Sequence, residues 1–470
     1  MPSGWIIIFS MKTKIVIGVI VLMLIVAAGM AIYAWNSTPQ LVKSYPQTGA
    51  INVPATSPIR LVFSRAMDQE TVNTRLKIEP AIGGTFKWDK NILTFTPDQA
   101  WPGGQMIKLI LESGARAASW ISFPLGRQSW TFDVNEAMLA YLWPSDGRAD
   151  IYALTPTTGE IRQFTHGLGV LDFTVSNNGI MIYFSAPNSQ GGVNLYRIDR
   201  TEVENSTEYS YQAQELLDCG TAQCRNPVAS FDDLKLAYEY ILPNPSGGSG
   251  PAQIWLLNLT SSEALPIGQE THETVQPSWS STGLLAYYDR TSSGYEVINP
   301  LSQERVLLPN QTGQPGDWSP SGEYYLAPEI YYYQAPKDTE RGTSHLIRYG
   351  VNSNTTEDIS KSIDVEDVAA SYSPDGSSIA FARKFLDAAH WSLGRQIWIM
   401  NVDGSSSHPI TDEADYNHYD LAWSRDGLML AYVRFEESRI FNPPELWMVN
   451  ADGSNALQLV IRGYSPIWIP

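Results

Sequence analysis

The sequence predicts an all-β protein that follows one hydrophobic helix at its N-terminus. Among its 470 residues are 24 Tyr, 15 Trp, 35 Gly and 30 Pro, whereas charged residues make up only 17%. Aromatic residues favour strands, and glycine and proline favour the turns between them. Two patterns support this class: polarity alternates with a period of two in the first part of the chain, and a strand–turn–strand pattern recurs along the rest.

The first element is an apolar stretch over residues 15–35 that contains no charged residue. About twenty helical residues, at 1.5 Å each, cross the ~30 Å hydrocarbon core of a bilayer. Lys12 and Lys14 precede the stretch and no lysine follows until Lys43, so the positive-inside rule places the N-terminus in the cytoplasm. Residues 1–36 are therefore expected to be a cytoplasmic tail and a single-pass membrane anchor, with a cleaved signal peptide as the alternative.

The next segment, residues 37–136, is predicted to be a β-sandwich of about a hundred residues. Apolar residues alternate with polar ones in short runs, for example at Ile59, Leu61 and Phe63. Asp-Lys-Asn at residues 89–91 has the composition of a turn that joins two strands.

Three segments of this domain carry a resemblance to a known family: YPQTGAINVPATSPIRLVFSRAMD, GTFKWDKNILTFTPDQAWPGGQMIKLIL and SWTF. Together they resemble the bacterial Ig-like domain of the SbsA type found in S-layer proteins, over about residues 40–134. The resemblance implies a spacer or adhesion module that holds the rest of the chain away from the membrane.

A repeated pattern fills residues 137–470. An apolar-aromatic strand, a Ser-x-x-Gly turn and a Leu/Ile-Ala-Tyr/Phe strand recur at intervals of roughly 40 to 54 residues, and a Trp-containing strand and an outer strand follow most copies. The serines of the turns are Ser176, Ser230, Ser280, Ser319, Ser373 and Ser424. Four strands per repeat at this spacing indicate the blades of a β-propeller.

The two ends of the repeat region complement each other. The segment from Met138 lacks the first strand of the pattern, whereas the C-terminal RGYSPIWIP contains a first strand with nothing after it. In that segment Pro466 and Trp468 align with Pro277 and Trp279. We therefore expect the C-terminal strand to complete the first blade and to close a ring of seven blades, with six as the alternative count.

The clearest copies of the repeat are ASYSPDGSSIAFARKF and LAWSRDGLMLAYVRF. They resemble the WSPDG-type repeats of TolB and of the propellers in oligopeptidases, and the resemblance covers about residues 137–470. It implies a TolB-like propeller. Because TolB works with envelope lipoproteins and Tol proteins, it also implies a role in the bacterial cell envelope.

The sequence predicts no catalytic residue, no cofactor and no metal site. The nucleophile elbow G-x-S-x-G is absent, and residues 247–250 lie in a Pro/Gly-rich loop without its spacing. Asp375 and Asp426 occupy repeated turns, where their side chains are expected to bind local backbone N–H groups. Asp403 and Asp452 lack the further carboxylates of a calcium loop, so they too are interpreted as turn residues.

The charge and the cysteines restrict the partners and the compartment. A formal net charge of −18 argues against a nucleic-acid partner, which needs a stripe of lysine and arginine. Cys219 and Cys224 lie in the polar segment CGTAQC, and we predict a disulfide between them in an oxidising compartment.

The long irregular loops all belong to one face of the predicted propeller, because the loops between second and third strands and those between blades share that face. Aromatic residues on loops of a rigid scaffold favour binding. The candidate ligand-face residues are Tyr331, Tyr332, Tyr333, His390, Trp391 and Phe441. Their alternative role is packing on the ends of the blades.

The function predicted from these features is that of a membrane-anchored, extracytoplasmic binding or scaffold protein rather than an enzyme. Its propeller would recognise a protein, a peptide or a cell-wall glycan. The alternative is a carbohydrate-active propeller enzyme, either a polysaccharide lyase or a glycoside hydrolase. For that chemistry the predicted innermost strands offer only Asp172, Asp317 and Asp420 as acids.

Overall fold

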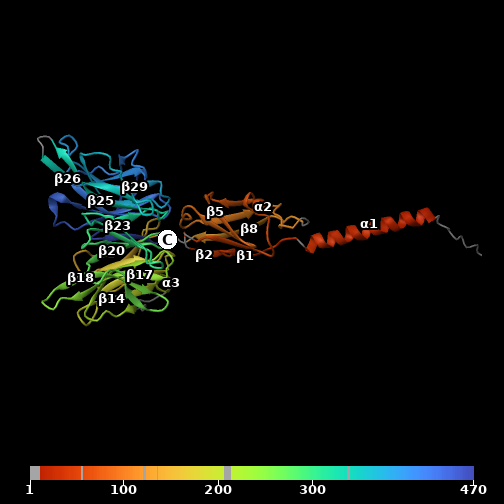
Figure 1. The fold of residues 1–470 in the computed structure, drawn as a ribbon, viewed down its shortest axis with the longest axis horizontal. Coiled ribbons are helices and arrows are strands. Elements are labelled where there is room, and N and C mark those ends of the chain that lie inside the picture. The colour runs from red at the N-terminus through yellow and green to blue at the C-terminus, as the bar shows by residue number, and fades with distance from the viewer. Residues whose placement is uncertain are drawn as a thin grey trace, which may run out of the picture. The chain divides into compact units, whose positions relative to one another are not determined.

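The computed structural model describes residues 11–36, 38–53, 55, 57–119, 123–134, 136–205, 213–335 and 339–469 (Figure 1). The chain divides into two compact units. Unit 1 contains residues 1–53 and 57–134, and unit 2 contains residues 54–56 and 135–470.

The chain begins with helix α1 (Met11–Asn36), whose side chains are described for residues 19–30 and for Tyr33. The large apolar side chains in this part are exposed, as at Leu22 (62%) and Met23 (66%). The sequence predicts a transmembrane helix over residues 15–35. Within the residues that the structure describes, no helix is both long and apolar enough to cross a membrane.

Unit 1 consists of two four-stranded sheets with orders β1-β3-β6-β5 and β2-β8-β7-β4. Trp101 packs against Phe95 of the first sheet and Phe132 of the second, with ring centroids 6.2 and 5.8 Å away. Its indole N–H donates to the Ser57 carbonyl at 2.7 Å, so this buried polar atom is satisfied. The two sheets therefore share one core, as in a β-sandwich.

The strands of unit 1 are β1 (Leu41–Tyr45), β2 (Ala50–Val53), β3 (Ile59–Phe63), β4 (Leu76–Glu79), β5 (Gly84–Asp89), β6 (Ile92–Pro97), β7 (Met106–Leu111) and β8 (Gln128–Val134). The short helix α2 (Gln69–Asn73) follows β3, and the Asp68 carboxylate accepts from the Thr71 N–H at its N-terminus.

Unit 2 is built from successive groups of four antiparallel strands, the arrangement of a β-propeller. In the first group β36 (Tyr464–Ile469) pairs with β9 (Met138–Trp143), followed by β10 (Asp150–Thr155) and β11 (Glu160–Gln163). The predicted pairing of the C-terminal strand with the first sheet is present, with Trp468 opposite Leu139. No free edge is left on the β36 side of β9.

An eight-stranded sheet contains the next two groups, which the parallel pair Val193 and Gln223 joins. The first comprises β12 (Asp172–Val175), β13 (Met181–Pro187), β14 (Val193–Asp199) and β15 (Gln214–Leu217). Helix α3 (Arg200–Asn205) follows β14. The second comprises β16 (Gln223–Ala229), β17 (Lys235–Pro243), β18 (Ser249–Asn258) and β19 (Ala264–Pro266).

Four further four-stranded sheets complete unit 2. They comprise β20 (Thr274–Trp279), β21 (Leu285–Asp289), β22 (Gly294–Ile298) and β23 (Arg305–Pro309); β24 (Asp317–Trp318), β25 (Tyr324–Ala335), β26 (Thr339–Gly350) and β27 (Thr355–Asp358); β28 (Val365–Tyr372), β29 (Ser378–Phe385), β30 (Gln396–Asn401) and β31 (His408–Pro409); and β32 (Tyr416–Trp423), β33 (Met429–Glu436), β34 (Glu445–Asn450) and β35 (Leu457–Ile461). The short 3-10 helix η1 (Glu437–Arg439) follows β33. Figure 1 shows β14, β17 and β18 on the opposite side of unit 2 from β25, β26 and β29.

A tryptophan hydrogen bond recurs between the first strands of neighbouring groups. Each indole N–H donates to a backbone carbonyl of the preceding first strand, at 3.0 to 3.2 Å. The donor and acceptor pairs are Trp279 and Val228, Trp318 and Ser278, Trp423 and Ser371, and Trp468 and Ala422. The repeated tryptophan therefore ties one sheet to the next as well as filling the space between them.

First strands also bulge at a repeated position. The bulge residues with positive φ are Asn226, Gln276, Ala369, Asp420 and Ser465. A bulge withdraws backbone groups from the ladder, so their N–H groups need other acceptors. Carboxylates of the preceding group supply three of them: Asp172 for Asn226, Glu239 for Gln276 and Asp420 for Ser465.

The tryptophan bond predicts a stability difference between two matched substitutions. Trp423→Phe removes the donor to Ser371, whereas the indole nitrogen of Trp255 is buried without a partner among the described residues. We expect Trp423→Phe to lower the free energy of unfolding by about 1–2 kcal/mol more than Trp255→Phe, because only the first leaves a carbonyl unpaired. Chemical denaturation of both variants measures this difference, and equal losses would show that the bond contributes nothing.

Candidate functional site

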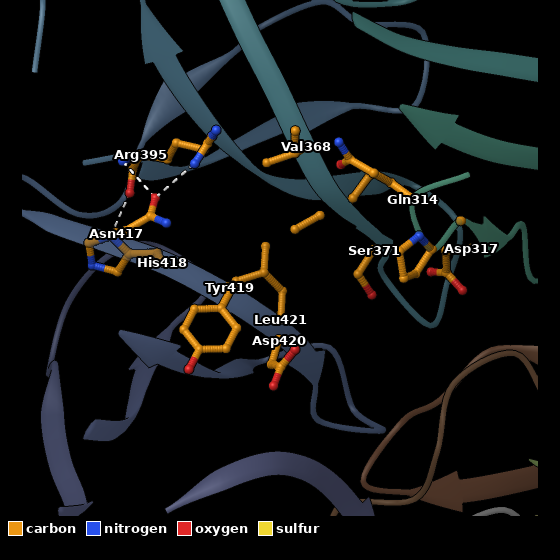
Figure 2. Close-up of a pocket in the computed structure, with 14 residues that line it drawn as sticks. Gln314, Asp317, Val368, Ser371, Arg395, Asn417, His418, Tyr419, Asp420 and Leu421 are labelled. Atoms are coloured by element: carbon orange, nitrogen blue, oxygen red, sulfur yellow. Dashed lines mark hydrogen bonds between the residues drawn. The ribbon is translucent and has the colours of Figure 1, made fainter. Parts of the chain in front are cut away.

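A cavity of about 460 Å³ lies among three consecutive first strands, β24, β28 and β32 (Figure 2). Its lining residues are Gln314, Pro315, Gly316, Asp317, Val368, Ala369, Ala370, Ser371, Arg395, Asn417, His418, Tyr419, Asp420 and Leu421. The volume is in the range of small-molecule pockets. Most of the lining residues come from segments about 50 residues apart in the sequence, so only the folded chain assembles the cavity.

The cavity lies toward one face of unit 2, here called the loop face. Its lining residues precede the Ser-x-x-Gly turns that end the first strands, and Arg395 of the lining belongs to the connection between β29 and β30. Because neighbouring strands are antiparallel, the connections between second and third strands lie at that same end. The long connections 386–395 and 437–444 are of this kind.

Arg395 and Asn417 lie at one end of the cavity and Asp317 and Ser371 at the other (Figure 2). The Arg395 guanidinium donates to Glu366 Oε1 at 3.0 Å through Nε and to Asn417 Oδ1 at 3.3 Å through Nη1. Arg395 therefore already has an anionic partner, and the ion pair fixes its guanidinium in place.

Asp317 is half-buried and anchors two backbone groups. Its carboxylate accepts from the Trp318 N–H at 2.9 Å and from the Tyr372 N–H at 2.8 Å. Burial raises the pKa of Asp317 to about 6, although these hydrogen bonds act in the opposite direction. The protonated form of Asp317 is therefore favoured more than in an exposed aspartate.

Asp420 is the second carboxylate in the cavity. It lies at the bulge of β32, and the Ser465 N–H donates to it. The side chain faces the solvent in the cavity, yet the surrounding protein limits its hydration and raises its pKa. Figure 2 shows Asp420 beside Tyr419 and Leu421, slightly below the centre of the view.

His418 contributes to the lining from a buried position. Its Nδ1 lies 2.7 Å from the Arg395 carbonyl oxygen, and its Nε2 lies 3.6 Å from Glu413 Oε2. His418, together with the Arg434 guanidinium at 3.1 Å, holds the pKa of Glu413 below its usual range. These groups form a compensated cluster behind the cavity.

The structure places the three candidate tyrosines on a strand instead of a loop. Tyr331, Tyr332 and Tyr333 belong to β25, which pairs with β26 in a hairpin of twelve residues per strand. The expected loop is therefore wrong, because the ladder continues as regular pairs from Tyr324 to Ala335. Tyr332 is 52% exposed, whereas the Tyr331 ring stacks on the ring of His345 at 4.3 Å.

The other three candidates lie on the connections where the sequence predicts them. Trp391 is 56% exposed, and the Lys384 ammonium lies 4.9 Å from its ring centroid. His390 Nδ1 lies 2.9 Å from Asp387 Oδ1. Phe441 is 97% exposed, so this ring does not pack on a sheet end.

Backbone contacts connect these segments around the cavity. The Gly394 N–H donates to the Ala414 carbonyl, and the Glu437 N–H donates to the Asp415 carbonyl, both at 2.9 Å. In the hairpin, Ser344 Oγ donates to the Asp367 carbonyl of β28, also at 2.9 Å. The candidate aromatic residues thus belong to three consecutive groups of strands, the same groups that line the cavity.

Arg395, Asn417 and Tyr419 are site residues that sequence reasoning missed. Arg395 ends the connection 386–395, in which only His390 and Trp391 are predicted site residues, and the other two lie on β32, where the sequence offers Asp420 as the candidate. A signal existed for Asn417 and Tyr419, because both lie on a predicted first strand and first strands are the innermost strands of a propeller. Nothing local marks Arg395.

The repeated aspartates act within their turns. Asp375 Oδ1 accepts from Ser373 Oγ at 2.6 Å and from the Ser377 N–H at 3.0 Å, and Asp426 accepts from Ser424 and Leu428 in the same way. Hydrogen bonds to the side chain and backbone of Ser405 lower the pKa of Asp403, and those of Ser454 lower the pKa of Asp452. Within the described ranges, no three His, Cys, Asp or Glu side chains gather as metal ligands would.

The opposite face of unit 2, here called the turn face, carries the Ser-x-x-Gly turns. Arg425 in the turn after β32 interacts electrostatically with Asp233 in the turn after β16, and burial lowers the pKa of its guanidinium. Asp233 also accepts from the Asn177 N–H at 2.7 Å and the Asn178 N–H at 3.1 Å. The turns of two consecutive groups, after β12 and β16, are therefore linked on this face to a turn of a distant group, after β32. Elsewhere in unit 2, Cys219 and Cys224 form a disulfide.

Comparisons with known proteins bear on both units. Residues 36–133 match the family model of the bacterial Ig-like domain. A comparison with curated proteins finds no match. Similar solved structures include a putative TolB from Agrobacterium tumefaciens, with 17% identity, a TM-score of 0.37 and coverage of 69% of this chain and 88% of that chain.

Two further similar structures bear the names of enzymes. The oligogalacturonate lyase from Vibrio parahaemolyticus is 14% identical, with a TM-score of 0.40 and coverage of 62% of this chain and 73% of that one. The acylaminoacyl peptidase from Pyrococcus horikoshii is 12% identical, with a TM-score of 0.46 and coverage of 69% and 50%. Residues 36–133 are thus a bacterial Ig-like domain, and the structures similar to the chain include TolB-like β-propellers.

Proposed function

We propose that this chain is a membrane-anchored, extracytoplasmic binding or scaffold protein whose propeller holds a protein, peptide or cell-envelope ligand at the loop face, without catalysis. The observation that carries the proposal is the cavity among β24, β28 and β32, together with exposed aromatic side chains from the same three groups of strands. A concave site with aromatic residues at its margin has the anatomy of a binding hot spot.

The aromatic residues of the loop face support binding because exposure of large rings to water is unfavourable. Tyr332, Trp391 and Phe441 are each more than half exposed. Burying one such ring against a partner removes on the order of 100–200 Å² from water and stabilises a complex by a few kcal/mol.

A rigid scaffold for this face follows from seven blades in a ring. Seven successive four-stranded groups support that count, and so do the four tryptophan bonds between first strands and the pairing of β36 with β9. The last of these bonds joins the C-terminal strand to β32, so consecutive sheets are tied across the chain ends.

The anchoring part of the proposal rests on α1. Its described large side chains are apolar and exposed around the helix, and the segment 15–35 contains no charge. Among the described residues no helix is long and apolar enough to span by itself, so the proposed anchor depends on the whole apolar segment 15–35, for which the acyl chains of a bilayer supply an apolar environment. The Ig-like domain then serves as a spacer between the membrane and the propeller.

Photo-crosslinking tests the binding face. A photoreactive phenylalanine analogue at position 391 or 441 is expected to capture a reproducible envelope component, identified by mass spectrometry. The matched control is position 231, because Phe231 is 52% exposed but lies in a turn of the turn face. Capture only from position 231, or equal capture from both faces, would contradict the proposal.

Membrane extraction tests the anchor. The full chain is expected to remain in the membrane pellet after extraction with alkaline carbonate, which releases peripheral proteins but leaves spanning helices in place. A chain that starts at residue 37 is expected in the soluble fraction. Release of the full chain by carbonate would exclude α1 as an anchor.

A carbohydrate-active enzyme is the second candidate, and Asp317 is the observation that favours it. A carboxyl group with a pKa of about 6 in a cavity resembles a general acid, and Asp420 supplies a second carboxyl group nearby. If the protein is an enzyme, reducing ends or unsaturated products will accumulate from acidic polysaccharides, and Asp317→Asn will abolish them. We expect neither product from the wild-type chain.

A further inference from the structure

The cavity carries negative charge that the protein itself does not compensate. Most charged side chains around it are paired: Arg395 with Glu366, Arg434 with Glu413 and Glu445, and Arg383 with Asp367. Asp317 and Asp420 are the exceptions, because no lysine, arginine or histidine of the described residues lies within ion-pair distance of either carboxylate.

The hydrogen bonds of these two carboxylates leave acceptor capacity open. Asp317 accepts from two backbone N–H groups and from Ser371, and Asp420 accepts from the Ser465 N–H. A carboxylate offers about four lone-pair sites. Incomplete hydration makes an uncompensated charge costly, and a cationic group in the cavity would relieve that cost.

An aromatic ring beside Asp420 suits the same type of ligand. Tyr419 lines the cavity, and burial together with the charge of Asp420 raises the pKa of its hydroxyl to about 12. It therefore stays neutral, and a neutral tyrosine ring is able to attract a cation. Neighbouring parts of the loop face already use this contact, with the Arg434 guanidinium 4.1 Å from the Tyr416 ring centroid and the Lys384 ammonium 4.9 Å from that of Trp391.

We propose that the cavity among β24, β28 and β32 binds the cationic side chain of a basic peptide segment, a guanidinium or an ammonium group, between Asp317, Asp420 and Tyr419. The proposal rests on the proposed binding function and names the chemistry of its ligand. A side chain fits the cavity of about 460 Å³, and the exposed aromatic residues of the loop face contact the flanking peptide.

Calorimetry with defined peptides tests the proposal on the full chain in detergent. The probe is an acetylated and amidated Gly-Gly-Arg-Gly-Gly, with lysine and citrulline versions for comparison, because citrulline keeps the shape of arginine without its charge. We expect the arginine peptide to bind at least about tenfold more tightly than the citrulline peptide, since the loss of one charge-assisted contact has this size. The lysine peptide distinguishes an ammonium from a guanidinium as the preferred group.

Two variants locate the contact and one controls for overall charge. Asp420→Asn keeps an oxygen that accepts the Ser465 N–H, so an unchanged thermal unfolding midpoint is expected while arginine-peptide affinity falls about tenfold. Asp317→Asn keeps an acceptor for only one of its two backbone donors, Trp318 and Tyr372, so a lower midpoint is expected together with a similar loss of affinity. Asp412→Asn removes an exposed acid of the loop face that does not line the cavity, and it should leave affinity unchanged.

Three outcomes would overturn the inference. They are equal affinity for arginine and citrulline peptides, an equal loss in Asp412→Asn and Asp420→Asn, and no binding of any peptide at millimolar concentration. If the crosslinking experiment still captures a partner from positions 391 and 441, the binding function stands and only the cationic ligand is refuted. Without such capture, both fail together.

Discussion

The hydrogen bond from each repeated tryptophan to the preceding first strand is the interaction on which unit 2 depends. A four-stranded sheet has two apolar faces and cannot bury both alone, so each sheet needs neighbours at a fixed distance and angle. The indole of Trp423 fills the space against β28 and binds the Ser371 carbonyl, and Trp468 repeats this between the C-terminal strand and β32. One side chain thus fills the space between two sheets and also helps to fix the angle between them.

Bulges in the first strands impose the second constraint. At Gln276 and Ser465 the chain adopts positive φ, and the N–H groups find acceptors in Glu239 and Asp420 of the preceding groups. Acidic side chains of the preceding group are therefore required for a structural reason. In the groups that line the cavity, Asp420 accepts from the bulge at Ser465, and Asp317 accepts from the backbone of the next first strand at Tyr372. Both carboxylates also set the charge of the cavity, so fold and binding chemistry share the same atoms.

The two faces of unit 2 differ in how the backbone N–H groups of their connections are hydrogen-bonded. On the turn face, side chains such as Asp375 and Asp426 satisfy the backbone within four or five residues, and Arg425 and Asp233 link turns across the unit. Such turns tolerate little variation in length. Connections on the loop face bind the scaffold mainly through a few backbone contacts, as at Gly394, and so have room for exposed aromatic residues.

Much of this architecture could be predicted from the sequence because it depends on local chemistry. Alternating polarity predicts the strands of the Ig-like domain, the Ser-x-x-Gly turns mark where first strands end, and the unpaired repeat at each end of unit 2 predicts the pairing of β36 with β9. These signals depend on residues a few positions apart or on a simple repeat, and a single chain displays both. The same local reasoning explains why Asp375 and Asp426 were interpreted correctly as turn residues.

Tertiary structure alone decided the rest. The cavity joins residues from three first strands. Its shape depends on bulges such as those at Ala369 and Asp420, which no local sequence pattern predicts. Arg395 enters the lining because Glu366 and Asn417, both more than 20 residues away, hold its guanidinium. The extension of β25 and β26 into a long hairpin likewise follows from pairing between strands, since Tyr331 to Tyr333 are compatible with either a loop or a ladder. Long-range pairing and burial, which set these features, exist only once distant segments have met.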